Sequence, residues 1–518
     1  NESFATFSSY QAQAAMGEAD PVWRDFYGLK GWAYYQDQLS TTHPIETEVS
    51  SAQLATANFD GITYAKGASA LKQLAFFVGD AAYQRGVARY FQQYAWQNAT
   101  RAQFIAEIAG AADHDLNEWT HAWLQTEGLA TISLLRDEHT ATLRQQSHNT
   151  PRLAPHRTRI GAFNLNGAGN LVLTREETVS YREAAVSLPW LTTGTPPDFV
   201  YPNYGDMDYG LFFLDDHSFQ TALTHLARLE SPFTRQMVWG TLFSMVRHQR
   251  LAPTQLMDTL LKNVPLEQDV GLLGFLFGGS NTSQLNYYFL TPEQRNHYAP
   301  ALEEMLWKGY ESAAEESDAT LIWQDAFVRL ASRPETRPRL ETLFDRSEGD
   351  PQRRWRILNK LSVLATPDME PRIAAELERD PSALGQRYAL VCRVAVPTLE
   401  NKEAYWGMLT DPTVPALSFR SAAGAFQSAL WPELSLPFAE RWLAHVRATD
   451  WESEPHRIGT WFGSLFPPIT TPEALEAGRD ALKASDLPPR ATRAWQEALD
   501  RAAQVVAVRN QVVARESK

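Results

Sequence analysis

NESFATF (residues 1–7) and FDGITYAKGASALKQL (residues 59–74) are the two stretches that decide the fold of this chain. The first predicts an amphipathic helix that begins at Glu2 and has Phe7 among its apolar positions. Taken alone, a glutamate there is typical of a solvated surface residue. Taken alone, Tyr64 before Lys-Gly is typical of a core residue at the start of a helix.

The chain has three regions of different sequence pattern, and its 518 residues allow about three or four domains. We expect residues 1–128 to be helical, residues 129–216 to form a small β-sandwich, and residues 217–518 to form a solenoid of helical hairpins. The predicted fold class is therefore mainly α with a small β-sandwich.

Local signals support the first two regions. Thr100 with Gln103, and Asp115 with Glu118, have the spacing of capping boxes. Short β-rich runs follow, and Asn166-Gly167 predicts a hairpin turn between two of them.

The third region repeats one device, a capping side chain followed by a proline at the first helical position. The spacings are irregular, which predicts stacked helices but not a strict repeat array. The pairs are Ser231-Pro232, Thr291-Pro292, Asp350-Pro351, Thr366-Pro367, Asp380-Pro381, Asp411-Pro412 and Thr471-Pro472.

Composition narrows the class of function. The net charge is −14, of which −10 falls on residues 1–216, and this argues against binding a nucleic-acid backbone. No apolar run approaches the roughly 18 residues of a membrane span. Cys392 is the only cysteine, in an apolar run that predicts a buried, inert thiol, so no internal disulfide can form. We expect a cytoplasmic protein with no nucleic-acid or membrane partner.

The two opening stretches resemble motifs of the aminopeptidase N family of zinc metallopeptidases. NESFATF resembles the helix that carries a glutamate zinc ligand, and residues 59–74 resemble the family's tyrosine motif, Y-x-K-G-A-S. The resemblance is specific over residues 1–128, weaker over 129–217 and architectural beyond. It implies that residues 1–128 are the C-terminal helical part of a thermolysin-like catalytic domain, and that the last region forms a superhelical bowl.

The resemblance also implies roles for single residues. Glu2 would be the third ligand of one Zn²⁺ ion, after two histidines of an H-E-x-x-H helix. Tyr64 would be catalytic, with its hydroxyl stabilising the oxyanion formed at the scissile carbonyl of a peptide substrate. Arg457 loosely resembles an arginine that binds a peptide carboxylate in some members, although a surface salt bridge is the role favoured for it.

The sequence departs from the family at one decisive point, because it contains no H-E-x-x-H and no G-A-M-E-N stretch. His114 and His121 are seven residues apart, about 10.5 Å along a helix, which is too far to chelate one ion. We therefore expect a C-terminal portion of a zinc aminopeptidase. Its partner would be the N-terminal half of the same enzyme, which supplies the other zinc ligands and shares the ion.

Two other functions stay open for this chain. One alternative is an epoxide hydrolase with the same zinc machinery, and the other is a non-enzymatic helical scaffold. The long helical region and the sequence around Tyr64 favour the peptidase.

Asp206 and Asp208 lack the loop of a calcium site, so turn capping is expected of them.

Overall fold

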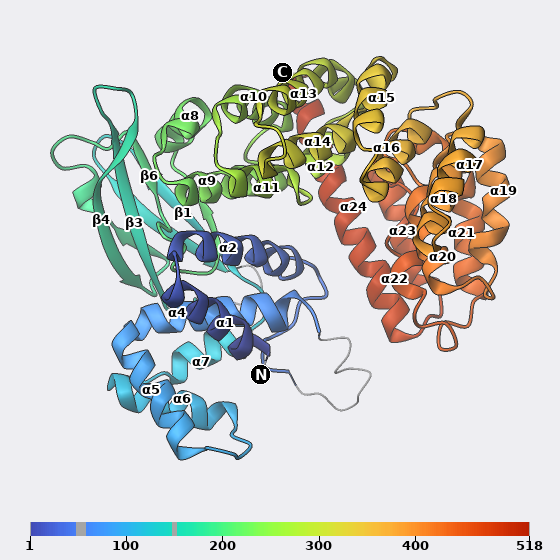
Figure 1. Cartoon of the computed structure of the whole chain (residues 1–518). Coiled ribbons are helices and arrows are strands. Elements are labelled where there is room, and N and C mark those ends of the chain that lie inside the picture. Colours follow the sequence, from blue (N-terminus) through green and yellow to red (C-terminus); the bar gives the residue numbers. More distant parts are fainter. Residues whose placement is uncertain (1, 48–58, 148–152, 517–518) are drawn as a thin grey trace. The chain divides into compact units, whose positions relative to one another are not determined.

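The computed structural model describes residues 2–47, 59–147 and 153–516. It consists of two compact units, residues 1–245 and residues 246–518. The architecture is mainly α with a small β-sandwich, which confirms the predicted fold class (Figure 1). The division into three domains proposed from the sequence stays a prediction.

The helices before the sandwich enclose an apolar core that includes Phe7, Phe26, Leu74 and Trp119. The predicted helix at Glu2 is present as α1, and Phe7 is 2% exposed. These helices are α1 (Glu2–Met16), α2 (Ala19–Gln36), the π-helical turn η1 (Ile62–Lys66), α4 (Gly67–Val78), α5 (Asp80–Gln93), α6 (Arg101–Ala112) and α7 (Asn117–Leu124). Two further helices, α8 (Asp216–His225) and α9 (Pro232–Arg247), follow the sandwich.

Two sheets form the sandwich, with strand orders β5-β2-β1-β7 and β4-β3-β6. β1 pairs with β7 in parallel, and the other paired strands are antiparallel. Ile132 and Leu143 of one sheet share a core with Ile160 and Val200 of the other. The strands are β1 (Ala130–Arg136), β2 (Ala141–Ser147), β3 (His156–Leu165), β4 (Leu171–Tyr181), β5 (Ala185–Ser187), β6 (Phe199–Tyr201) and β7 (Leu211–Phe213).

Two local predictions for this unit have mixed outcomes. The capping box of Thr100 and Gln103 is confirmed at α6, but α7 begins at Asn117 without a side-chain cap, so the second box is wrong. The β3–β4 hairpin is confirmed, although its turn is longer than Asn-Gly. The Asn166 side chain accepts hydrogen bonds from two amides of a loop in which Gly169, not Gly167, has φ +77°.

The described secondary structure of the second unit is helical, and many of its helices pack against near neighbours in the chain. The last helix, α24, runs back along the unit (Figure 1), and Arg509 donates to the carbonyls of Tyr288 and Leu290. The helices are α10 (Pro253–Asn263), α11 (Val270–Phe277), α12 (Asn281–Gln284), the π-helical turn η5 (Leu285–Phe289), α13 (Pro292–Ser312), α14 (Asp318–Leu330), α15 (Arg337–Arg346), α16 (Pro351–Val363), α17 (Met369–Arg379), α18 (Ala383–Ala395), α19 (Leu399–Thr410), α20 (Ala416–Phe426), α21 (Ala439–Ala448), α22 (Ile458–Trp461), α23 (Pro472–Lys483) and α24 (Pro489–Glu516).

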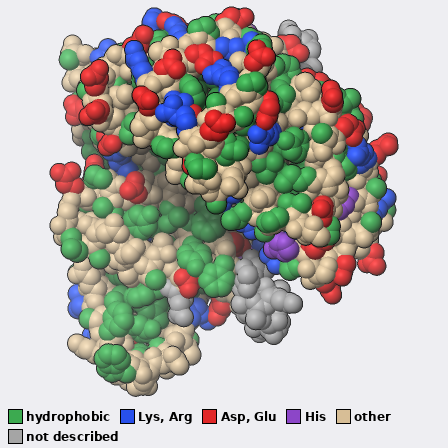
Figure 2. Space-filling view, turned by 45° about the vertical axis from the view of Figure 1, so that its right-hand side comes forward, with side chains coloured by type: hydrophobic (Ala, Val, Ile, Leu, Met, Phe, Trp, Pro, Cys, Tyr) green, Lys and Arg blue, Asp and Glu red, His purple; other side chains and the backbone are tan. Residues whose placement is uncertain are grey.

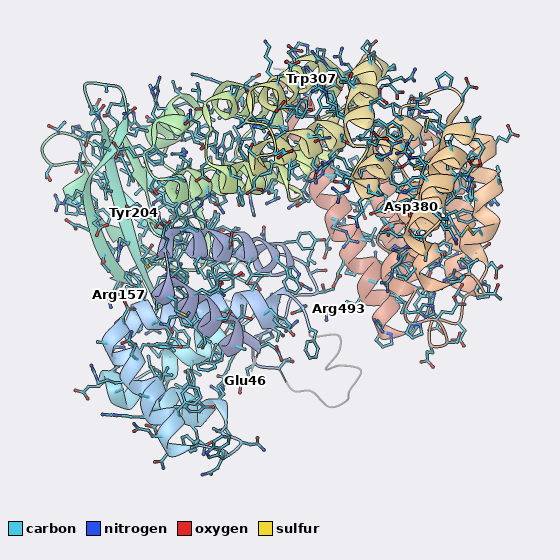
Figure 3. The ribbon with its side chains drawn as sticks, in the orientation of Figure 1. Glu46, Arg157, Tyr204, Trp307, Asp380 and Arg493 are labelled. Atoms are coloured by element: carbon cyan, nitrogen blue, oxygen red, sulfur yellow. The ribbon has the colours of Figure 1, made fainter. Side chains whose placement is uncertain are left out.

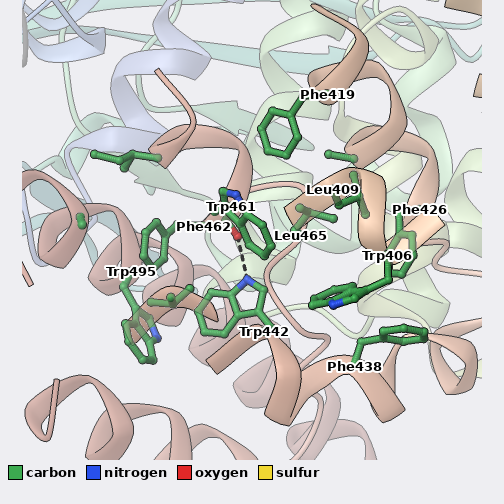
Figure 4. Close-up of a cluster of buried hydrophobic side chains, with 14 of the residues drawn as sticks. Trp406, Leu409, Phe419, Phe426, Phe438, Trp442, Trp461, Phe462, Leu465 and Trp495 are labelled. Atoms are coloured by element: carbon green, nitrogen blue, oxygen red, sulfur yellow. Dashed lines mark hydrogen bonds between the residues drawn. The ribbon is translucent and has the colours of Figure 1, made fainter. Parts of the chain in front are cut away.

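An aromatic core holds the C-terminal half of this unit together (Figure 4). Trp442 is 5.2 Å from Trp495 between ring centroids, in an edge-to-face arrangement. Its indole N–H donates to the Trp461 carbonyl at 3.1 Å. A buried indole is thus satisfied while its ring contributes apolar contact area.

The proline device is confirmed at four of the seven pairs. Ser231, Thr291, Asp350 and Thr471 each accept a hydrogen bond from the amide three residues on, at a helix start. It is wrong at the other three, because α17, α18 and α20 begin two to four residues after Thr366-Pro367, Asp380-Pro381 and Asp411-Pro412.

The surface carries both signs of charge. On the face drawn in Figure 2, Lys and Arg side chains are interspersed with Asp and Glu side chains. Within the described ranges, no helix has the length and apolarity needed to span a bilayer.

Candidate functional site

Glu2 and Tyr64 are 62 residues apart in the sequence, and their side chains lie close enough in the structure to interact. Tyr64 lies in η1, and Glu2 lies at the start of α1. Burial, followed by the interaction with the Glu2 carboxylate and its charge, raises the pKa of Tyr64 above its ordinary value. The two residues that the sequence singled out are therefore brought together.

A close approach of two helices makes this contact possible. α1 packs against η1 and α4 (Figure 1), and the Ser3 hydroxyl donates to the Thr63 carbonyl at 2.8 Å. A Cβ on Gly67 would lie 2.0 Å from the Ser3 Oγ, so a larger residue would force α1 away.

Asp60 organises the turn that carries Tyr64. Its Oδ1 accepts from the amides of Ile62 and Thr63 at 3.0 and 3.1 Å, and its Oδ2 is 2.8 Å from Nε2 of His43. Burial alone would raise the pKa of Asp60, but the hydrogen bonds from His43 and the two amides hold it below its ordinary value. The carboxylate thus stays ionised and fixes the start of η1.

Lys66 anchors the other end of the same turn. It is 2% exposed, and its Nζ donates to Asp37 at 3.0 Å and to the Gly128 carbonyl at 2.8 Å. Asp37 also accepts from the Gly128 amide and from the Tyr209 hydroxyl. This buried pair ties η1 to the end of α2 and to the entrance of the sandwich.

Two aromatic rings flank Tyr64. Trp32 stacks on it, with centroids 6.1 Å apart and planes 20° apart, and Phe59 lies at 6.0 Å. Trp32 is 43% exposed and Phe59 is 56% exposed. The tyrosine is thereby confined between two apolar surfaces that are also open to a bound molecule.

The described residues do not complete a metal site. They contain no group of three or more His, Cys, Asp or Glu side chains that could hold an ion. Glu2 offers one carboxylate, and the ring nitrogens of His43, which contacts the turn of Tyr64 through Asp60, are engaged by Asp60 and by the Pro44 carbonyl. A single half-buried carboxylate fits one ligand position of a zinc ion and no more.

Arg457 is placed inside the second unit. Its side chain is 1% exposed, so the expected salt bridge, which it makes with Glu454 at 3.1 Å, is not at the surface. It also donates to the Asp411 carbonyl at 2.9 Å and lies 3.9 Å from the Phe419 ring centroid. These contacts support a structural role, and nothing in them supports the predicted substrate contact.

Asp206 and Asp208 are the centres of a buried ionic network. Asp206 accepts from Lys30 at 2.6 Å and from Lys72 at 3.1 Å, and Asp208 lies 2.8 Å from Nδ1 of His156. The prediction of turn capping is therefore wrong for Asp206, because its carboxylate accepts hydrogen bonds from two lysines, one on α2 and one on α4.

Cys392 is confirmed as buried, and burial raises its pKa to about 12.

Comparison with known proteins finds two matching domain families in this chain. The Peptidase family M1 domain matches residues 1–123, and the ERAP1-like C-terminal domain matches residues 199–504. An aminopeptidase N of Streptomyces lividans is 31% identical over an alignment of 520 positions, which covers 95% of this chain and 60% of that protein.

Other relatives match shorter parts. A probable aminopeptidase 2 of Sulfurisphaera tokodaii is 33% identical over 26% of this chain and 17% of its own length. A tricorn protease-interacting factor F2 of Thermoplasma volcanium is 26% identical over 47% of this chain and 29% of its own length. The chain thus spans at most 60% of these relatives.

The fold and the two matched domains are those of the M1 peptidase family. The chain belongs to the aminopeptidase N family.

Sequence reasoning missed the residues that hold Tyr64 in place. Asp60 stands four residues before Tyr64, and an aspartate just before a helical run is a start signal that could have identified it. Lys66 and Asp37 gave no such signal, because a lysine within an apolar run does not reveal its partner.

Proposed function

We propose that this chain is part of a zinc aminopeptidase that hydrolyses N-terminal residues from peptides. Glu2 would supply the third zinc ligand, and Tyr64 would be the oxyanion-stabilising donor. The observation that carries the proposal is that Glu2 lies close enough to Tyr64 to raise its pKa, although the two residues stand in family motifs 62 residues apart.

One zinc ion would be shared with a segment outside this sequence. The sequence lacks H-E-x-x-H and the chain spans 60% of its Streptomyces relative, which supports two histidine ligands and a general-base glutamate from an N-terminal half. A zinc ion bound there would polarise a peptide carbonyl and activate water. This chain's own part is to hold the Glu2 carboxylate rigidly on α1 through the Ser3–Thr63 bond.

Tyr64 would act through its hydroxyl proton. A phenol has an ordinary pKa near 10, so Tyr64 is protonated at neutral pH and can donate. Asp60 and Lys66 fix the turn on either side of it. The hydroxyl is thereby preorganised, and such donors stabilise charge that develops in the transition state.

Peptides are the proposed substrates, and the proposed location is the cytoplasm. The extent of the match to an aminopeptidase N favours this over the epoxide hydrolase alternative. The contact between Glu2 and Tyr64 is also unexplained in a non-enzymatic scaffold. No nucleic-acid or membrane partner is proposed.

The test is Tyr64→Phe in the full-length protein, which keeps the ring between Trp32 and Phe59 and removes only the hydroxyl. We expect kcat for peptide hydrolysis to fall by roughly 10²–10³ with little change in KM, because the contact is made mainly in the transition state. Tyr94→Phe at the end of α5 is the control and should leave kcat unchanged. A near-normal kcat in the Tyr64 variant would return this residue to the role of a core side chain.

A further inference from the structure

A cavity in the first unit has a lining that includes neither Glu2 nor Tyr64. It has a volume of about 410 Å³, within the range of small-molecule sites. Its walls come from α1, α2, the C-terminal end of α4, the start of α5, β3 and the loop before β7. Of its lining residues on these helices, Phe7 stands five residues after Glu2 and Lys72 stands eight residues after Tyr64, which is roughly 7.5 and 12 Å along a helix axis.

The cavity gathers positive charge in an acidic part of the chain. Residues 1–216 contain fourteen Lys and Arg side chains against twenty-four Asp and Glu. Three of the fourteen, Lys72, Arg157 and Arg159, line this one cavity, and Asp80 is the acidic residue among its lining residues.

The capacity of these cationic side chains for ion pairs and hydrogen bonds is not fully satisfied within the protein. Lys72 is 8% exposed and shares the single carboxylate of Asp206 with Lys30. Burial, opposed by Asp206 and reinforced by Lys30, lowers the pKa of Lys72 to about 8, so it is mostly charged at neutral pH.

The two arginines also keep binding capacity. Arg157, labelled in Figure 3 at the side of the sandwich nearest α4, donates through Nη1 to the carbonyls of Phe76 and Phe77. Its Nε is buried and without a partner. Arg159 is 4.0 Å from Glu176, the outer limit of an ion pair. Guanidinium groups bind carboxylate and phosphate in a bidentate manner.

The rest of the lining is apolar. Phe7, Trp23 and Phe76 contribute aromatic rings, and Met207 contributes a flexible thioether. The guanidinium carbon of Arg157 lies 5.1 Å from the Phe76 ring centroid, so the cationic and aromatic surfaces are adjacent.

We propose that this cavity is a binding site for a small organic oxyanion with an aromatic or apolar body. The charged head would contact Arg157, Arg159 and Lys72, and the body would pack on the aromatic rings and Met207. This site is separate from the proposed zinc site and does not depend on peptidase activity.

The test is a calorimetric titration of the full-length protein with benzoate, phenyl phosphate and uncharged benzyl alcohol. It is run in the Glu2→Ala background, so that oxyanions bound at the proposed zinc site do not contribute. We expect saturable binding of an oxyanion and at least tenfold weaker binding of benzyl alcohol. The tighter of the two oxyanions identifies the head group as carboxylate or phosphate.

Two variants locate the binding. Arg159→Gln removes a partly exposed charge and should weaken oxyanion binding about tenfold or more, and Gln84→Glu, which places a carboxylate on the exposed rim of the cavity, should also weaken it. Arg144→Gln, on an exposed position of β2 outside the cavity, is the matched control and should bind as before. The proposal would be overturned if no saturable binding were observed, which is the result expected when another segment of the protein fills the cavity. It would also be overturned if Arg159→Gln bound the oxyanion with unchanged affinity.

Discussion

At the scale of single residues, the geometry of the site depends on a glycine, because a larger residue would not fit at that position. Gly67 is the glycine of the Y-x-K-G motif, and Ser3 of α1 fits against it. The contact sets the distance between the helix that carries Glu2 and the turn that carries Tyr64. The Y-x-K-G motif therefore reflects the close packing of two helices at its glycine as much as the chemistry of its tyrosine.

Gly67→Ala should therefore damage the site without touching either functional group. The added methyl group overpacks the contact, and we expect a loss of about 1–3 kcal/mol in the free energy of unfolding together with a lower kcat. The control is Gly31→Ala on α2, where nothing lies within 4 Å and the gain in helix propensity should stabilise by about 0.5–1 kcal/mol. Denaturant unfolding measures both variants, and equal effects of the two would contradict this account of Gly67.

The sequence identified Glu2 and Tyr64 because each stands in a distinctive run of residues. It could not identify the network of Lys30, Lys72 and Asp206. Lys72 is 134 residues and Lys30 is 176 residues away from Asp206 along the chain. Nor could it show that Arg457 is buried. Such contacts follow from tertiary packing, which no local pattern records.

At the scale of elements, the proline device shows where a local signal is sufficient. Thr291 caps α13 directly and forms a full capping box with Gln294. Asp380, in contrast, accepts from the Ser382 hydroxyl and the Trp355 indole, and Ser382 caps α18 instead. Aspartate before proline also forms such short turns, so the same two letters predict two structures.

A matched pair of substitutions tests this difference. Thr291→Val removes the cap of α13 and should cost about 0.5–2 kcal/mol of stability. Thr366→Val removes a buried hydroxyl that has no partner, so it should be neutral or slightly stabilising. Thermal unfolding of both variants measures the contrast, and a cost at Thr366 as large as that at Thr291 would refute it.

Lys402 of α19 gives the second unit a pH-dependent stability. It is 2% exposed and donates to the Val394 carbonyl at 2.8 Å, at the end of α18. Burial lowers its pKa from 10.5 to about 8. Between these two values the unfolded chain binds more protons than the folded chain, so stability rises with pH.

Lys402→Met removes that dependence. From pH 8 to pH 10.5, the free energy of unfolding of the unmodified protein should rise relative to the variant by up to about 3 kcal/mol. Lys483→Met, at an exposed lysine, is the control and should show a constant difference. Denaturant unfolding across this pH range checks both, and a constant difference for Lys402→Met would contradict the assignment.

At the scale of the whole molecule, the sequence predicted the order of architectures because helical and β patterns change visibly along the chain. The M1 match covers the part that carries Glu2 and Tyr64, and the ERAP1-like match covers the last β-strands and most of the helical remainder. In the proposed function, the described residues provide one zinc ligand, Glu2, and one transition-state donor, Tyr64. The central claim is that a segment outside this sequence completes the site around Glu2.

The most direct test of this claim is the zinc content of the full-length protein, measured by elemental analysis with and without Glu2→Ala. We predict one tightly bound zinc ion per molecule, which is lost with the peptidase activity in the variant, and no tight zinc on residues 1–518 alone. Glu46→Ala, at a glutamate paired with Arg101, is the control and should keep the ion. Zinc retained in full-length Glu2→Ala, or one tightly held equivalent on residues 1–518 alone, would contradict the claim.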